Sequence, residues 1–391
     1  MNSNTIRVLA AGVAVAALAI QAQRGFSSNT NPHKDDVIPN AVNKGVKWLI
    51  SVQGADGGWG QDGGATSYVR QGENLETKGN DVANTAVAAT ALLHAGHNGE
   101  YRAAIERAVD FILRHVEESP AEGLAVTDLN GTQIQRKLGP FIDTFLSSKL
   151  LAELDGNMHN ARLNARVRQG LEKCLAKIEK NQLKDGSWNV AGGWAPILGT
   201  SMASQSLFMA QKKGIAVSDV AMARVEQYTA SAGLAPAAGM GSGVEGGISK
   251  GARGVGSVSA EVSAGIPLYQ GAQALEQLSR TDKDRRKNAK QIKAITDRLS
   301  DERFATGFGS MGGEEFFSYL NISDSLHRTG GAEWEKWNGD MKTKLVRLQN
   351  DDGTWAGHHC ITGRVAVTSA AILTMLAERD SVTLQSGMKK N

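Results

Sequence analysis

The most reactive side chains of this sequence stand close together near its C-terminal end, in the segment GHHC. His358, His359 and Cys360 offer imidazole nitrogens and a thiolate, which are ligands that Zn²⁺ prefers. An earlier segment, EEFFSY, supplies a carboxylate from Glu315, with Glu314 as the alternative. One interpretation is a zinc site made by these residues, in which both histidines reach one ion only if they precede a helix. The other interpretation is a helix entrance with local polar contacts.

Further charged residues stand where helices are expected to begin. Asp81, Asp143, Glu261 and Glu315 are candidate catalytic groups for proton transfer, and Arg364 is a candidate to hold an anion. N-capping is the alternative for the aspartates, because a carboxylate at a helix start accepts hydrogen bonds from free backbone amides. His94 is expected at the end of a helix, where a histidine complements the helix dipole.

Three turns of the chain share the template Q-x2-D-G-x-W. They run from Gln53 to Trp59, from Gln182 to Trp188 and from Gln349 to Trp355. Each follows an amphipathic helix and leads to a second helix with apolar or small residues on nearly every side, such as VANTAVAATALLHA. An amphipathic helix covers a core, and a helix that is apolar all round lies inside one. The turns therefore join outer helices to inner helices.

The chain between the three turns has room for further, degenerate copies of the same unit. They are found at residues 101–154, 218–279 and 286–328, which brings the number of helical hairpins to six. No hairpin can bury its inner face alone, and closing a ring buries all of them. The fold class expected is all-α, an (α/α)6 toroid over residues 40–380. If the inner helices run parallel, their amino ends lie at the same opening of the toroid, called the mouth here. The polar candidate residues would then lie close together at this mouth.

The repeated Q-x3-G-x-W turns resemble those of the terpenoid cyclase and protein prenyltransferase superfamily of αα-toroids, over roughly residues 40–380. The resemblance implies that the Gln and Trp of each turn are structural and tie neighbouring hairpins together. Trp supplies a large buried surface, and Gln can satisfy unpaired helix-end amides. The neighbouring Asp56, Asp185 and Asp352 are interpreted as turn residues.

Neither chemistry of that superfamily is complete in this chain. Squalene cyclases protonate their substrate with an acid in a D-x-D-D-T-A motif, and the nearest string, DVANTA, has Ala83 at the position of the proton donor. GHHC resembles the zinc-binding His segment of the prenyltransferases, but Phe317 occupies the position of their zinc-binding Cys. Protein prenylation is also disfavoured because an exported protein lacks access to isoprenoid diphosphates. We expect no terpene cyclase activity.

The amino terminus predicts export. Residues 1–22 contain one Arg and then an apolar run that is too short to span a bilayer comfortably, which is typical of a signal peptide. An uncleaved anchor or a buried helix is the alternative. The mature chain, after a linker at 23–39, is expected in the periplasm or outside the cell, and no later segment is apolar enough to cross a membrane. A Gly-rich insert at 233–265 is either a lid or a tether, and 381–391 form a tail.

Two classes of function remain open. The first is a non-catalytic protein that binds a small-molecule, peptide or protein ligand at the mouth; the second is a zinc-dependent transferase or hydrolase. Glycan cleavage is a third possibility and would need paired carboxylates across the mouth. The net charge of +3, from 43 basic and 40 acidic side chains, is too balanced to imply nucleic acid as a partner. Cys174 lies on the apolar stripe of an amphipathic helix and is expected to be buried and inert.

Overall fold

The computed structural model describes residues 36–62, 79–96, 99–188, 196–233, 271, 274–299 and 312–378. The chain divides into two units, Met1–Val37 and Ile38–Asn391. The predicted signal peptide, most of the linker, the insert from residue 234 with Glu261, and the C-terminal tail lie outside the described residues. The architecture below is that of the second unit.

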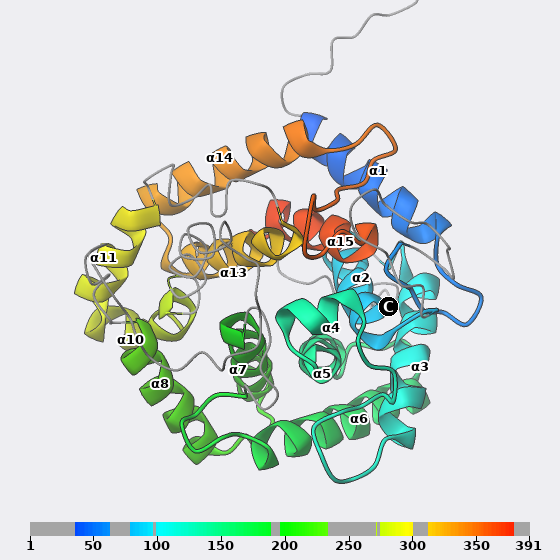
Figure 1. The fold of residues 1–391 in the computed structure, drawn as a ribbon, viewed down its shortest axis with the longest axis horizontal. Helices are drawn as coiled ribbons and strands as arrows, with labels where there is room; N and C mark the ends of the chain where they lie inside the picture. Colours follow the sequence, from blue (N-terminus) through cyan, green and yellow to red (C-terminus); the bar gives the residue numbers. More distant parts are fainter. Residues whose placement is uncertain are drawn as a thin grey trace, which may run out of the picture. The chain divides into compact units, whose positions relative to one another are not determined.

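The helices of this unit form two concentric rings (Figure 1). The outer ring consists of α1 (Val37–Ser51), α3 (Arg102–Glu118), α6 (Ala161–Lys180), α8 (Asp219–Gly233), α10 (Asp282–Lys287), α11 (Ala289–Leu299) and α14 (Ala332–Leu348). The inner ring contains α2 (Val82–Ala95), α5 (Ile142–Leu154), α7 (Pro196–Lys212), α13 (Gly313–Thr329) and α15 (Arg364–Met375). The helical residues 274–278 follow α8 in the chain and lie beside α7, because Gln277 bonds to Ser204. The predicted all-α toroid is confirmed.

Burial separates the two rings as the sequence patterns predict. On α2 every residue except His94 is buried, and on α5 every residue except Lys149. On α3, by contrast, one stripe that includes Ile105 and Ile112 is buried and the opposite face is polar. Outer helices therefore present one face to the core, and inner helices are enclosed on all sides. No described helix has the length and hydropathy that a membrane span requires.

The three Gln-Trp turns form the same hydrogen bonds. Each Gln amide donates to a carbonyl of its own turn and to a carbonyl of the next outer helix, and each Trp indole donates to the preceding outer helix. The links to the next outer helix run from Gln53 to Ala104, from Gln182 to Ala221 and from Gln349 to Ala41, at 2.8–2.9 Å. The Gln side chains thus bind carbonyls, not the helix-end amides considered from the sequence. Because Ala41 lies on α1, the last of these bonds joins the final hairpin to the first.

A threonine of each inner helix fastens the same turns from inside. The backbone amides of Trp59, Trp188 and Trp355 donate to the hydroxyls of Thr85, Thr200 and Thr368 respectively. All three indoles are buried. The turn therefore fixes the start of each inner helix against its outer partner, which sets the position of any functional group at that start.

Cys174 is a buried core residue, as expected. It lies on the apolar stripe of α6 with no exposed surface, and burial raises the pKa of its thiol to about 12. The thiolate is the reactive form of cysteine, so this side chain is chemically inert near neutral pH. The other free cysteine, Cys360, has a different environment.

Candidate metal site at the mouth of the toroid

Two glycine-containing segments meet at the starts of α13 and α15. A Cβ atom on Gly313 would lie 2.0 Å from the carbonyl oxygen of Ile361, and one on Gly357 would lie 2.2 Å from the same atom. Real side chains do not fit at such distances, so only glycine permits this contact between the segments. The amide of Gly313 also donates to the carbonyl of His359 at 3.3 Å. The contact brings the first turn of α13 beside residues 359 and 360.

Glu314, His359 and Cys360 form a group of possible metal ligands at this contact. Their ligand atoms all lie within 4.8 Å of one another, and His359 Nδ1 lies 3.1 Å from Cys360 Sγ. Glu314 is fully buried, and neither oxygen of its carboxylate has a hydrogen-bond partner. A buried carboxylate without a partner costs several kcal/mol unless a cation compensates it. The group therefore has the electrostatics of a cation site.

The backbone of Cys360 is strained. Its φ is 62°, and it is the one non-glycine residue with positive φ in the part of the chain that the structure describes. A residue with a side chain pays about 1–2 kcal/mol in this region. Such strain collects at functional sites, where the surrounding structure holds a side chain in a required orientation. Here it turns the thiol toward His359.

Thiolate, imidazole and carboxylate together suit Zn²⁺ better than Mg²⁺ or Ca²⁺, which prefer oxygen ligands. Two ligands of one tetrahedral zinc are about 3.5 Å apart, since each bond is about 2.0–2.3 Å long. The observed separations need only small side-chain rotations to reach that value. Space beside the group is limited, because a Cβ on Gly312 would lie 2.6 Å from His359 Cε1. Three protein ligands leave one coordination position for another molecule.

The structure groups only some of the alternatives in the expected ligand set. Glu314 and His359 lie with Cys360 in the group, whereas Glu315 and His358 do not, and metal binding remains a prediction. Glu315 accepts a hydrogen bond from Tyr319 at 3.5 Å, and His358 is exposed. Consecutive helical residues point about 100° apart, so only one of two adjacent glutamates can face a given point. The position assigned from the prenyltransferase pattern was one residue away.

Asp81 and Asp143 meet at the start of α2, where both act as caps. Asp81 accepts from the amide of Asn84 at 2.8 Å, and Asp143 accepts from the amide of Ala83 at 3.1 Å and from Gln135. Both carboxylates are buried. Burial raises the pKa of Asp81 to about 7, with a further contribution from the charge of Asp143, and burial raises the pKa of Asp143 to about 6. The pair can hold a proton near neutral pH, and its role in proton transfer remains a prediction.

Arg364 is engaged by two carboxylates. Its Nε donates to Asp62 at 2.9 Å, its Nη1 donates to Asp352 at 2.8 Å, and its guanidinium lies over the ring of Trp48 at 4.9 Å. These contacts fasten the start of α15 to the first hairpin. These contacts give Arg364 a role in the framework, and the anion-holding role expected from the sequence remains a prediction.

Gln133 supports the loop of residues 359–363, which carries the candidate ligands His359 and Cys360. This role was not recognised from the sequence. Gln133 begins α4 (Gln133–Leu138), is almost fully buried, and donates to the hydroxyl of Thr362 at 2.9 Å. Its carbonyl oxygen accepts from the amides of Thr362 and Gly363 at 2.9 and 3.0 Å. The segment GTQIQ contains the signal for this helix, since Thr132 and Gln135 form a capping box. Nothing in one sequence indicates that Gln133 reaches a loop in the last hairpin.

The carboxyl ends of the inner helices form the opposite mouth. There His94 Nε2 lies 2.7 Å from Glu153 Oε2, and Lys149 lies 3.7 Å from Asp324. Burial alone would lower the pKa of His94, but the charge and hydrogen bond of Glu153 outweigh it and raise the pKa. His94 therefore has a specific ion-pair partner beyond the expected interaction with the helix dipole.

A small cavity of about 20 Å³ lies between the described inner helices. Its lining includes both apolar and polar side chains, such as Phe317, Lys149 and Asn321. Space of this size holds one or two water molecules. Gln205 crosses the lumen and donates to Asn321 at 3.0 Å. Among the described residues, the inner helices therefore pack on one another around a small polar centre.

Two comparisons with known proteins found similarities. Residues 20–131, less than half of the chain, match the family model of the squalene-hopene cyclase C-terminal domain. Among solved structures, the chain is similar to a variant of the type II terpene cyclase MstE from Scytonema in complex with its substrate geranylgeranyl dihydroxybenzoate. The identity is 11%, the TM-score is 0.49, and the match covers 88% of this chain and 97% of that chain. No curated protein matches the sequence. The family match supports the resemblance to the αα-toroid superfamily.

Proposed function

We propose that this protein is a toroid that binds a transition-metal ion, best suited to Zn²⁺, at Glu314, His359 and Cys360, and that a ligand of the protein approaches this ion at the mouth. The observation that carries the proposal is the carboxylate of Glu314, which is fully buried without a hydrogen-bond partner next to a thiol and an imidazole. A purely structural helix entrance does not explain that arrangement, because the uncompensated group destabilises the fold.

The three-ligand set favours a reactive over a purely structural ion. Structural zinc sites normally have four protein ligands, whereas catalytic sites keep a position open. A zinc ion there would supply Lewis-acid chemistry, polarising a carbonyl or lowering the pKa of a bound water molecule. The chain itself contributes the strained Cys360 and a site with no space for further side chains beside Gly312. A metal-dependent hydrolase or transferase is therefore the reaction class that we favour, and a metal-binding protein without catalysis is the alternative.

We further propose that the protein does not cyclise terpenes. Ala83 stands at the position of the proton-donating acid, and its side chain cannot protonate an alkene. Incubation with squalene, followed by gas chromatography, tests this directly. Formation of any cyclic product would refute it.

Metal analysis of the purified protein tests the zinc proposal. We expect about one equivalent of zinc per chain, since the group can hold one ion. Cys360→Ser and Glu314→Gln should each lose most of it. His358→Ala and Cys174→Ala are matched controls, because each removes a metal-binding side chain outside the group, and both should keep their zinc. Absence of stoichiometric metal, or equal metal in all five proteins, would overturn the proposal.

We also propose export, on the basis of the signal-like residues 1–22. Expression of the full chain, followed by mass spectrometry of the protein recovered outside the cytoplasm, tests this location. A mature amino terminus close to residue 23 is the expected result. Retention of the complete chain in the cytoplasm would contradict it.

A further inference from the structure

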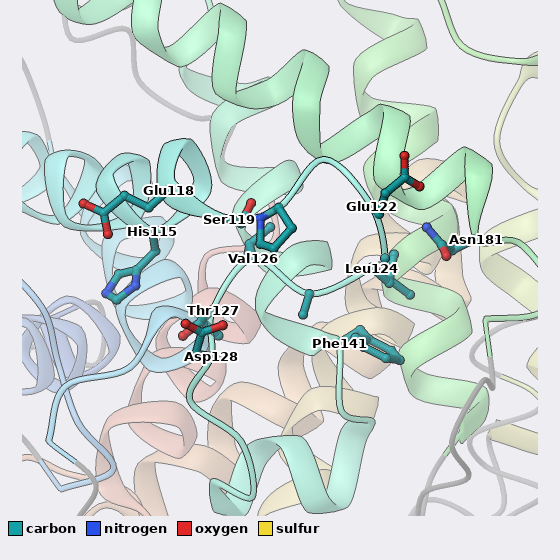
Figure 2. A pocket seen from close by; sticks show the side chains of 13 residues that line it. His115, Glu118, Ser119, Glu122, Leu124, Val126, Thr127, Asp128, Phe141 and Asn181 are labelled. Carbon is teal, nitrogen blue, oxygen red and sulfur yellow. The ribbon is translucent and has the colours of Figure 1, made fainter.

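A second pocket, separate from the metal site, opens between the end of α3, the start of α5 and the end of α6 (Figure 2). Its volume is about 520 Å³, which is within the range of small-molecule sites, roughly 300–1,000 Å³. Leu124, Val126 and Phe141 supply apolar lining, and the first two are buried. The loop of residues 119–131, which joins α3 to α4, forms most of the wall.

This loop is irregular in conformation but firmly held. Lys177 is almost fully buried, and its ammonium group donates to the carbonyls of Pro120 at 2.6 Å and Gly123 at 3.2 Å. Lys173 donates to the carbonyl of Ser119 at 2.6 Å. Burying a lysine ammonium group costs free energy unless its N–H groups form hydrogen bonds, which here go to the loop carbonyls. The pocket is therefore preformed, which lowers the entropic cost of binding a ligand.

Hydrogen-bond donors around the pocket are used within the protein. The hydroxyl of Ser119 donates to Val116, and the side-chain amide of Asn181 donates to Lys177. The two lysines behind the loop donate to its carbonyls, as described above. Ser119, Asn181 and the two lysines thus have internal acceptors and are not available to bind an anionic ligand.

The charged side chains at the rim are acidic. Glu118 and Asp128 are exposed at the pocket, and neither forms an ion pair with a lysine or arginine among the described residues. Glu122 differs, because its carboxylate pairs with Lys180 at 2.5 Å. His115 is half-buried, and burial lowers its pKa, so it is neutral near pH 7 and adds no positive charge. Figure 2 shows Asp128 between His115 on α3 and Phe141 at the start of α5.

We propose that this pocket binds a small organic cation, an amine with an apolar body. The ammonium group lies toward Glu118 and Asp128, and the apolar part contacts Leu124, Val126 and Phe141. The volume, the apolar lining and the two exposed carboxylates at the rim favour this class over an anion or a neutral sugar. The inference is independent of the metal proposal, because none of the metal ligands lines the pocket.

Binding of three matched probes to the full chain tests the inference. Phenethylamine, phenethyl alcohol and phenylacetate share an aromatic body and differ in charge. We expect saturable binding of the amine by ligand-observed NMR, about fivefold weaker binding of the alcohol and no binding of the acid, because exposed charge pairs contribute up to about 1 kcal/mol. Equal affinity for amine and alcohol would overturn the assignment to a cation.

Variants locate the site. The double variant Glu118→Gln/Asp128→Asn should weaken amine binding about tenfold, and Ala125→Trp should abolish it by filling the pocket without changing its charge. Asp340→Asn, which removes an exposed carboxylate on α14, is the matched control and should bind normally. Circular dichroism confirms that each variant is folded. Unchanged amine binding by folded Ala125→Trp would show that the amine binds elsewhere and would refute the proposal.

Discussion

The two mouths of the toroid bury carboxylates in opposite ways. At the carboxyl ends of the inner helices, Glu153 is compensated by His94 at 2.7 Å. At the amino ends, Glu314 has no hydrogen-bond partner for either oxygen. Both side chains are buried on inner helices, so the difference is in their neighbours. A compensated charge is explained by the fold itself, whereas an uncompensated one requires a ligand or a functional reason.

The contrast predicts different consequences for the same substitution. Glu153→Gln should lower the free energy of unfolding by about 3 kcal/mol, because it leaves the charged partner of a buried pair without compensation. Glu314→Gln in metal-free protein should change it by less than about 1 kcal/mol or stabilise the fold, because the uncompensated charge is removed. Urea unfolding after chelation measures both. An equally large loss in Glu314→Gln would show that its carboxylate has a partner in the protein.

Dependence on pH should also differ between the mouths. The pKa of Asp81 is raised to about 7 and that of Asp143 to about 6, against about 3.9 in an unfolded chain. The folded state therefore binds more protons than the unfolded state over this window, and their contribution to stability is lost as pH rises through 6 to 7. At the other mouth, burial raises the pKa of Glu153, but His94 outweighs burial and lowers it, while the pKa of His94 is raised. Stability from Glu153 is lost as pH falls, and that from His94 as pH rises above its raised pKa.

The free energy of unfolding, measured between about pH 5 and pH 8, separates the contribution of Asp81 and Asp143 from that of His94 and Glu153. Asp81→Asn should remove about 1–2 kcal/mol of the decline in stability across this range, because an amide does not titrate. His94→Gln should be destabilising chiefly below its raised pKa, where the wild-type imidazole is charged. If Asp81→Asn kept the full decline, the carboxylates at the start of α2 would not be its source.

A smaller effect is expected when the hydrogen bonds that support the loop of residues 359–363 are removed. Gln133→Ala removes three hydrogen bonds to Thr362 and Gly363 and should lower zinc affinity about tenfold, as loss of an outer support does in other metal sites. Gln205→Ala, which removes a lumen hydrogen bond, is the control and should leave zinc affinity unchanged. Competition with a chromogenic chelator measures the affinity. Equal affinities in wild type and Gln133→Ala would assign Gln133 to the framework alone.

A comparable effect is expected at the Gln-Trp turns, which lie at the starts of the inner helices. Gln349→Ala should cost about 1–2 kcal/mol, because it removes two hydrogen bonds that include the link to Ala41. Gln182→Ala provides the matched comparison, since it removes the equivalent pair of bonds, to Gly186 and to Ala221 of the next outer helix, at a turn that does not close the ring. Thermal unfolding measures both. A negligible effect of Gln349→Ala would indicate that hydrophobic packing closes the ring without this bond.

The fold could be predicted from the sequence because the same helical hairpin and turn recur along the chain. The Q-x2-D-G-x-W turns and the alternation of amphipathic and apolar helices are local patterns, and each was sufficient to place an outer helix before an inner one. Because the inner helices run parallel, their amino ends were expected at one mouth. This placed residues of α13 and α15 close together. These inferences needed only the periodicity of a helix and the number of hairpins.

The identity of the site residues was less accessible, because it depends on rotation and contact. Choosing Glu314 over Glu315 requires the rotation of α13 about its axis, which the contact between Gly313 and Ile361 determines. The framework role of Arg364 depends on Asp62, a residue of another hairpin. Long-range pairs of this kind leave no periodic signal in one sequence. The positive φ of Cys360 could not be predicted either, since glycine is the residue type that commonly indicates this conformation in a sequence.

The link from Gln349 to Ala41 has a consequence for biosynthesis. The toroid is closed by a bond between residues separated by 308 positions, so the side of its first outer helix that meets the last hairpin stays without this partner until nearly the whole domain has left the ribosome. The ligands Glu314, His359 and Cys360 all lie in the last two hairpins and meet only at that stage. A truncated or stalled nascent chain therefore lacks a complete set of the candidate ligands, and the proposed zinc site would form only late in synthesis.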